Sequence, residues 1–212
     1  MTMFDLLFVV VVLASVSTLI AAFVQILRRH VRRALTMLSV LGVGLAAYVG
    51  VVIAVSLASS QGVVAAGQDR CFDDWCVAVE SAASVGTLGE GDQAISANGV
   101  FYVVTLRLSN HGRGRPQRAS SAAVFLRDEE GRTYDVSRDG QRAFEAGHGP
   151  TAPLTTMLAV GQPVVTVRVF DVPASARISG LTIQHPVGLG PGLFVIGDES
   201  SLFHEPTLSL LR

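Results

Sequence analysis

Two long apolar runs dominate the first part of the chain. Residues 4–27 and 34–59 hold almost no charged side chain, and each run is long enough to cross the roughly 30 Å hydrocarbon core of a bilayer as a helix. The second run also exceeds the ~7–15-residue apolar core of a cleavable signal peptide. We therefore predict a two-helix transmembrane hairpin over residues 1–60, with helices at about 4–27 and 34–59.

After residue 60 the pattern changes to the alternation of β-strands. In residues 100–108 the apolar positions recur every second residue, with Val104 and Leu106 on one face and Thr105 and Arg107 on the other. No helical periodicity of useful length is present in this part. Further strands are predicted at residues 77–83, 122–127, 132–136, 164–172, 181–184 and 207–211. About seven short antiparallel strands indicate an immunoglobulin-like β-sandwich of two sheets.

Residues 164–172 alternate as well, and we expect Val165, Val167 and Val169 to face the core while Thr166 and Arg168 face solvent. Around these strands we predict a linker at residues 61–69 and a sandwich domain at residues 70–212. Residues 138–163 form a long Gly- and Pro-rich segment that is predicted to be irregular, where it could cover one end of the sandwich or bind a partner.

Charge sets the predicted orientation of the hairpin. The loop between the apolar runs holds Arg28, Arg29, Arg32 and Arg33, and the next arginine is Arg70. Because cytoplasmic loops carry the excess of basic residues, we expect this loop inside and both termini outside, in a bacterial cytoplasmic membrane. The rest of the chain holds 12 Arg and 16 acidic residues, and this mildly acidic balance excludes the basic footprint of nucleic-acid binding.

Small residues recur every fourth position along the second apolar run. The stripe consists of Gly42, Ala46, Gly50 and Ala54, a spacing that lets two helix backbones approach closely. We expect the stripe to pack against the first helix of the same chain. The alternative is contact with another subunit or another membrane protein, which would make the second helix an oligomer interface.

The two cysteines of the chain, Cys71 and Cys76, lie just beyond the predicted linker. In an extracytoplasmic domain they would meet oxidising conditions, and a turn over the four intervening residues would bring them within bonding reach. We predict a disulfide. The alternative is a metal site using both thiolates with Asp73 or Asp74, but the chain has no second ligand pair at the usual spacing.

Several short motifs resemble a known family. Residues 101–112 form an apolar strand that ends in Asn-x-Gly, residues 126–134 contain D-x-x-G-x-x-Y, and residues 170–173 read F-D-V-P. This pattern resembles an extracytoplasmic immunoglobulin-like domain family of bacteria that is related to a secreted mycobacterial antigen. The resemblance covers about residues 76–185 and implies a sandwich without established catalytic residues. The tail over residues 196–207 resembles a recurring ending of soil-bacterial proteins.

No pattern of catalytic chemistry is evident. The five histidines lack the spacing of a metal pair, although His185 and His204 could converge in space, and no nucleophile elbow or phosphate loop is present. The acids at 128–130 suit a solvated hairpin tip better than a calcium site. We therefore expect no catalytic residue, metal or cofactor. The predicted partners are the lipid bilayer and a protein or envelope component.

The preferred prediction is a membrane-anchored, non-enzymatic binding domain of the cell envelope. One alternative is an accessory subunit of a membrane complex that contacts its partner through the transmembrane helices. A second alternative is an envelope hydrolase that uses dispersed histidines and acids.

Overall fold

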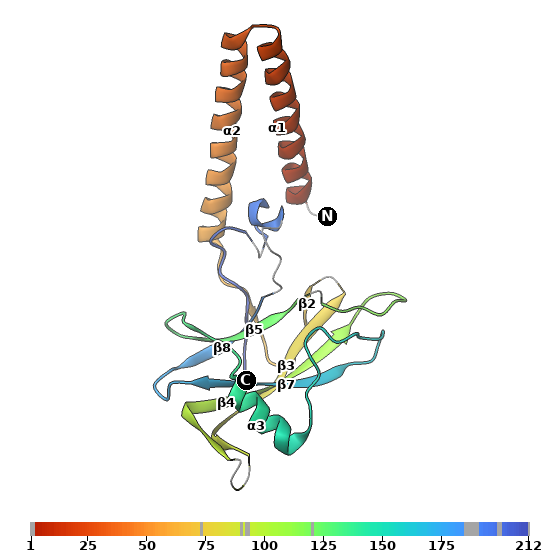
Figure 1. Ribbon diagram of the computed structural model, residues 1–212, viewed down its shortest axis with the longest axis vertical. Coiled ribbons are helices and arrows are strands. Elements are labelled where there is room, and N and C mark those ends of the chain that lie inside the picture. Colours follow the sequence, from red (N-terminus) through yellow and green to blue (C-terminus); the bar gives the residue numbers. More distant parts are fainter. Residues whose placement is uncertain are drawn as a thin grey trace. The chain divides into compact units, whose positions relative to one another are not determined.

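The structure is a computed structural model that describes residues 3–72, 74–89, 91, 94–119, 121–184, 191–198 and 201–211. The chain forms two compact units (Figure 1). One unit contains residues 1–61 and 188–205, and the other contains residues 62–187 and 206–212. The units therefore differ from the expected boundaries, because part of the C-terminal region groups with the N-terminal helices.

The first unit is built on α1 (Met3–Leu27) and α2 (Val31–Ala58). Both helices are long and apolar enough to cross a membrane, which confirms the predicted pair of apolar helices. The backbone of Arg29 has a positive φ of 59°, and the His30 N–H donates to the carbonyl oxygen of Gln25. This αL turn ends α1 and lets the chain reverse within three residues.

The second helix begins earlier than predicted. Arg32 and Arg33 lie in the first turn of α2 and not in the loop, which spans only residues 28–30. Hydropathy predicts a start at residue 34 because the apolar run begins there. Arginine favours helix formation, so the backbone helix extends past that boundary.

The C-terminal segment of this unit includes a short 3-10 helix, η2 (Pro191–Phe194). The hydroxyl of Tyr48 in α2 donates to the carbonyl oxygen of Phe194 at 2.7 Å, and the side chains of Ser56 and Ser201 share a buried hydrogen bond of 2.7 Å. These contacts place residues 191–198 and 201–205 with the helices, whereas the sequence pattern had assigned them to the sandwich.

The second unit is a sandwich of two sheets. Their strand orders are β1-β9-β8-β5-β6 and β2-β3-β4-β7. Neighbouring strands are antiparallel except the short parallel pair β1–β9. The strands are β1 (Val63–Val64), β2 (Arg70–Phe72), β3 (Trp75–Leu88), β4 (Ile95–Asn110), β5 (Ala123–Asp128), β6 (Thr133–Tyr134), β7 (Val164–Val172), β8 (Ile178–Gln184) and β9 (Leu208–Ser209).

The main core lies between the two sheets. Val104, Leu106 and Leu108 of β4 are fully buried there, together with Leu126 of β5 and Leu181 of β8. This confirms both the predicted sandwich and the predicted inward face of β4. The strand β1, which pairs with β9, lies in residues predicted to be a linker.

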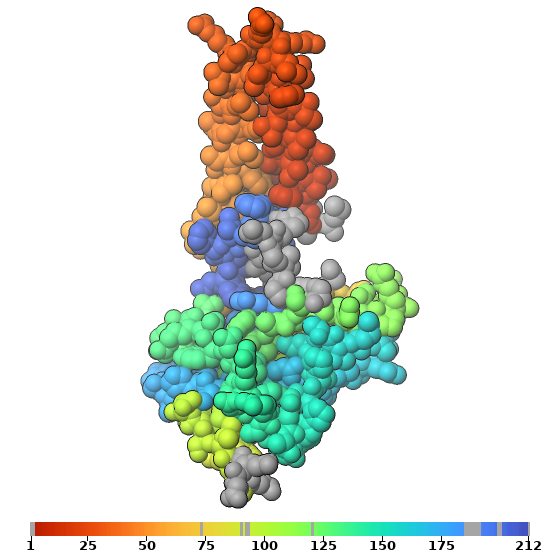
Figure 2. All heavy atoms as spheres, viewed as in Figure 1, coloured from red at the N-terminus to blue at the C-terminus, as the bar shows by residue number. Residues whose placement is uncertain are grey.

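A helix also forms in the segment that was predicted to be irregular. The helix α3 (Arg138–His148) begins at Ser137, whose hydroxyl accepts a hydrogen bond from the Gly140 N–H. Figure 2 shows the residues of α3, in green, on one face of the sandwich unit. Ala143 and Phe144 belong to this helix, and their side chains pack toward the sheet beneath it.

The helix α3 packs closely on the outer face of the sheet β2-β3-β4-β7. A second apolar cluster lies under it, with Phe101, Val169 and Leu88 as its buried members. At Gly140 an added Cβ atom would lie 2.8 Å from Cγ1 of Val169 and 3.0 Å from Cε1 of Phe101. Glycine is therefore required by the close approach of α3 to the sheet, although it also weakens the helix signal in the sequence.

The predicted faces of β7 were wrong. Pairing with β4 places Arg168 opposite Val104 and Thr166 opposite Leu106, so these two polar residues lie on the core side. The predicted inward residues Val167 and Val169 pack instead toward the second cluster, and Val165 is 55% exposed. Both faces of β7 are covered, so alternation of residue type could not indicate which face meets the core.

Candidate functional sites

A disulfide closes the hairpin between β2 and β3. Cys71 and Cys76 are directly opposite in the register, and their sulfur atoms are bonded at 2.03 Å. This confirms the predicted bridge. Of the two residues at the tip, Asp73 lies outside the described residues and Asp74 accepts a hydrogen bond from Gln117 at 3.2 Å.

His111 lies beside this disulfide. Its Nε2 is 3.2 Å from a carboxylate oxygen of Asp69. Among the described residues, Cys71, Cys76 and His111 form the one group of three whose donor atoms lie within 4.8 Å of one another. Because each sulfur is bonded to the other, neither is a thiolate, so the oxidised hairpin does not offer the metal site considered as an alternative.

The remaining histidines do not gather into a second cluster within the described residues. His148 stacks on Phe144 with ring centroids 4.3 Å apart, which makes it part of α3. His204 belongs to the unit of the helices. His185 lies outside the described residues, and so does the convergence with His204 that the sequence left open.

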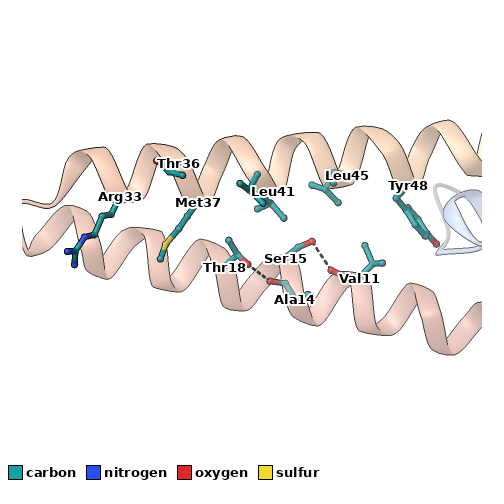
Figure 3. Close-up of a pocket in the computed structure, with 12 residues that line it drawn as sticks. Val11, Ala14, Ser15, Thr18, Arg33, Thr36, Met37, Leu41, Leu45 and Tyr48 are labelled. Atoms are coloured by element: carbon teal, nitrogen blue, oxygen red, sulfur yellow. Dashed lines mark hydrogen bonds between the residues drawn. The ribbon is translucent and has the colours of Figure 1, made fainter.

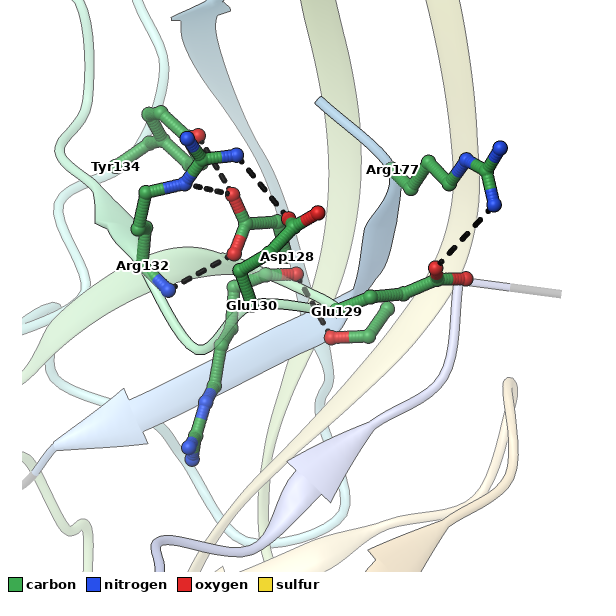
Figure 4. Close-up of polar contacts among 8 residues, drawn as sticks. Asp128, Glu129, Glu130, Arg132, Tyr134 and Arg177 are labelled. Atoms are coloured by element: carbon green, nitrogen blue, oxygen red, sulfur yellow. Dashed lines mark hydrogen bonds and ion pairs between the residues drawn. The ribbon is translucent and has the colours of Figure 1, made fainter. Parts of the chain in front are cut away.

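The acidic hairpin tip at residues 128–130 is held by hydrogen bonds and ion pairs (Figure 4). The carboxylate of Asp128 accepts hydrogen bonds from the Arg132 N–H at 2.8 Å, from Arg132 Nε at 2.6 Å and from the Tyr134 hydroxyl at 2.7 Å. Glu130 and Glu129 pair with Arg132 and Arg177, respectively. The acids therefore have partners within the fold, and the D-x-x-G-x-x-Y motif describes this turn.

The environment of Asp128 changes its acidity. Burial acts to raise the pKa of the carboxyl, but the hydrogen bonds from Tyr134 and Arg132 and the charge of Arg132 together outweigh it, and the pKa lies below its ordinary value of 3.8. The same contacts raise the pKa of Tyr134. This group is therefore a charged, buried anchor and offers no proton near neutral pH.

A cavity of about 760 Å³ opens beside β5, and it is the best candidate for a ligand site in the sandwich unit. The four consecutive residues 122–125 line it on one side. Because side chains of a strand alternate between its two faces, four residues in a row can line one cavity only along the edge of the strand.

The edge of β5 is open at this cavity. β6 pairs with β5 only at Leu126 and Arg127, and the same register continued by two residues would place Val136 opposite Val124. Val136 instead bridges to Phe170 in the other sheet. In the part of the chain that the structure describes, the N–H and C=O of Val124 have no strand partner on this side, although its side chain is buried.

The lining of the cavity also contains three charged residues, Arg138, Arg168 and Asp135. Arg168 is held in place, because its guanidinium donates to the carbonyl oxygens of Ala152 and Val167 and to the hydroxyls of Thr151 and Thr166. Burial lowers the pKa of Arg168, with the charge of Glu145 opposing that shift. Arg138, at the first residue of α3, is the exposed cation of the cavity.

The edge of β7, the last strand of the other sheet, is closed. The side-chain amide of Gln141 donates to the carbonyl oxygen of Val167 at 3.2 Å and accepts from the Val169 N–H at 3.1 Å. The Ser137 N–H also donates to the carbonyl oxygen of Val169. One sheet edge is therefore covered by α3, as natural sandwiches require, while the edge at Val124 stays open.

The predicted packing stripe on α2 does not contact α1. Gly42, Ala46, Gly50 and Ala54 are all exposed, and an added Cβ atom at Gly42 or Gly50 would meet nothing within 4 Å. The residues of α2 that face α1 lie on another side of the helix and include Met37, Leu41 and Leu45. Close packing of the stripe on α1 is therefore contradicted at Gly42 and Gly50.

The predicted topology residues lie at the end of the hairpin where the chain reverses. Arg28 and Arg29 follow α1, and Arg32 and Arg33 lie in the first turn of α2. The two apolar helices fit a membrane anchor, and the disulfide fits an oxidising environment for the sandwich.

Comparison with known proteins gives only distant likenesses. No protein-family model matches the chain, and no curated protein is similar to it. Two solved structures are similar with a TM-score of 0.42. One is a conserved hypothetical protein from Bacillus anthracis, at 19% identity over 57% of this chain and 88% of that chain. The other is an uncharacterized beta-sandwich protein from Clostridium difficile 630, at 9% identity over 73% of this chain and 96% of that chain.

Both likenesses lie at a level that transfers neither ligand nor activity. The expected relation to the mycobacterial antigen type stays a prediction.

Proposed function

We propose that the protein is a membrane-anchored, non-enzymatic binding protein whose sandwich captures an extended segment of a protein partner at the edge of β5. The single observation that carries this proposal is the open N–H and C=O of Val124 beside a cavity of about 760 Å³. An extended peptide that adds to a sheet edge satisfies such groups and gains affinity from main-chain hydrogen bonds.

The side chains around the cavity indicate which segment would fit. The floor along residues 122–125 is mainly apolar, and Arg138 supplies an exposed positive charge in the lining. The negative charge of Asp135, which also lines the cavity, would repel a strongly acidic ligand. The proposed partner segment is therefore extended, with apolar side chains toward β5 and one acidic side chain at Arg138.

The proposed location is the outer side of a bacterial cytoplasmic membrane. Its support is the group of four arginines in the loop after α1 and the first turn of α2, together with the disulfide of the sandwich. In this arrangement the anchor tethers the sandwich to the membrane, and its partner would be another envelope protein.

The proposal is tested by photo-crosslinking in living cells. A photoreactive residue placed at Thr155, which lines the cavity, should yield one discrete protein adduct. The same residue at exposed Arg113, which does not line it, should yield none. Arg138→Glu should lower the yield at Thr155, while Arg142→Glu, on the same helix, should not. Equal yields from Thr155 and Arg113 would refute the proposed site.

A second candidate function is an accessory subunit that contacts a membrane complex through α2. It is favoured by the exposure of all four residues of the small-residue stripe, which have no partner in α1. Ala46→Leu should then dissociate the complex in mild detergent, whereas Val43→Leu, at a bulky exposed position of the same helix, should leave it intact. An unchanged complex in both variants would exclude this function.

A further inference from the structure

The space between α1 and α2 forms a second, independent cavity of about 650 Å³. Figure 3 shows its residues projecting from both helices into the gap. Along α2 the lining runs from Arg33 to Tyr48, which at 1.5 Å per residue is a length of about 22 Å. The cavity is therefore a long, narrow groove within the apolar part of the anchor.

The walls of the groove are apolar in their chemistry. Ser15 and Thr18 donate their hydroxyl hydrogens to carbonyl oxygens one turn earlier in α1, and Thr36 does the same in α2. These hydroxyls are satisfied within their own helices, so they present no free donor to a polar ligand. Apart from Arg33 and Tyr48 at the two ends, the remaining wall residues, such as Val11, Met37 and Leu41, have side chains without polar hydrogens.

The two ends of the groove differ. At one end the hydroxyl of Tyr48 is bound to the carbonyl oxygen of Phe194, and η2 lies beside it. At the other end lies Arg33, for which the described part of the chain supplies no carboxylate partner. Arg28, Arg29 and Arg32 are nearby in the sequence. The groove therefore has a Tyr48 end, bonded to η2, and a positively charged end at Arg33.

We infer that this groove holds one acyl chain of a phospholipid whose phosphate lies on Arg33. Dividing the volume by the length along α2 gives a mean cross-section of about 30 Å², and the shorter lining of α1, from Val11 to Thr18, sets an upper value of about 60 Å². A helix about 10 Å across would lie over such a groove and not within it, whereas a single hydrocarbon chain fits inside. Arginine is suited to bind the phosphate at the mouth, because its planar guanidinium can donate two parallel hydrogen bonds.

This lipid site does not depend on the proposed binding edge of the sandwich. The bound phospholipid belongs to the leaflet on the side of the arginine loop. Its acyl chain extends from Arg33 along the groove toward Tyr48. The lipid would fill the gap between the helices, beside small buried residues such as Ala22 and Ala34.

The test uses the full chain in nanodiscs that contain phosphatidylglycerol with a photoreactive group near the end of one acyl chain. Labelled peptides should cover residues 11–18 and 41–48. Gly44→Phe fills the groove and should lower this labelling by about tenfold. Gly42→Phe is the matched control, because an added Cβ atom at either glycine meets nothing within 4 Å and only Gly44 lines the groove.

The role of Arg33 is tested with a diacylglycerol that carries the same photoreactive chain but no phosphate. The phospholipid should label wild-type protein more strongly than the diacylglycerol, and Arg33→Gln should remove this difference. Equal labelling of the Gly44→Phe and Gly42→Phe proteins would overturn the inference. So would protein–protein crosslinks from the groove residues, which would show a helix from a second chain in place of a lipid.

Discussion

Glycine at position 140 decides whether α3 can lie on the sheet. Alanine would favour the isolated helix by roughly 0.5–1 kcal/mol, but its Cβ atom would lie 2.8 Å from the stiff, fully buried side chain of Val169. We expect the clash to win, so Gly140→Ala should destabilise the sandwich by about 1–3 kcal/mol.

Gly147 is the matched control on the same helix. An added Cβ atom there meets nothing within 4 Å, so Gly147→Ala should stabilise by up to about 1 kcal/mol. The fluorescence of Trp75, the single tryptophan of the chain, reports unfolding in urea because this residue is buried in the main core. Equal effects of Gly140→Ala and Gly147→Ala would contradict the close packing of α3 on the sheet.

Asp128 gives the hairpin tip a dependence on pH. Its pKa is lowered in the folded state, so its charged form stabilises the fold above the unfolded pKa of about 4, and this contribution is lost as pH falls through the lower folded value. Asp128→Asn should reduce the urea midpoint at pH 7.

The difference between wild type and Asp128→Asn should shrink as the pH is lowered below about 4, because wild-type Asp128 then becomes protonated too. Glu129→Gln, which changes an exposed acid of the same turn, should leave the midpoint nearly unchanged. A difference that stays constant from pH 7 to pH 2 would show that the charge of Asp128 does not stabilise the turn.

At the scale of elements, β7 and α3 were misread for one shared reason. The strand has apolar residues on both faces because α3 covers the outer one, but the glycines at 140 and 147 hide the helix in the sequence. Without the helix, the alternation of residue types predicts Val165, Val167 and Val169 as the inward set. Strand β4 was read correctly along residues 104–108, because polar Thr105 and Arg107 mark its outer face.

The corrected faces give different consequences for one type of substitution. Val104→Asp would bury a carboxylate between the sheets and should destabilise by more than about 3 kcal/mol. Val165→Asp should change the free energy of unfolding by no more than about 0.5 kcal/mol, because Val165 is 55% exposed. Measured in urea with Trp75 fluorescence, similar losses for both would contradict the observed register of β4 and β7.

At the scale of the whole molecule, the apolar runs and the strand alternation were sufficient to predict two helices and a two-sheet sandwich. The disulfide was also predictable, because its cysteines are the only two in the chain and are close in sequence. The cavity at β5 was not predictable. It depends on Val136 pairing with Phe170 and not with β5. Tertiary packing between residues far apart in sequence determines this pairing.

The orientation of the anchor is the prediction on which the proposed location depends. A reporter that is active only in the cytoplasm should be active when inserted at His30 and inactive when fused after Arg212. The reverse pattern would place the sandwich in the cytoplasm, where the Cys71–Cys76 disulfide would be reduced. A reporter active only outside the cytoplasm is the control, and it should give the opposite result at each site.

The most direct measurement of the proposed function is amide hydrogen exchange at Val124 in the full chain, with and without the partner captured through Thr155. The N–H of Val124 lies on the open edge of β5, where the described residues supply no strand partner. Partner binding should slow its exchange by about tenfold or more. The amide of Phe125, on the edge that faces β8, should be protected in both states. Unchanged exchange at Val124 in the bound protein would contradict capture of an extended segment at this edge.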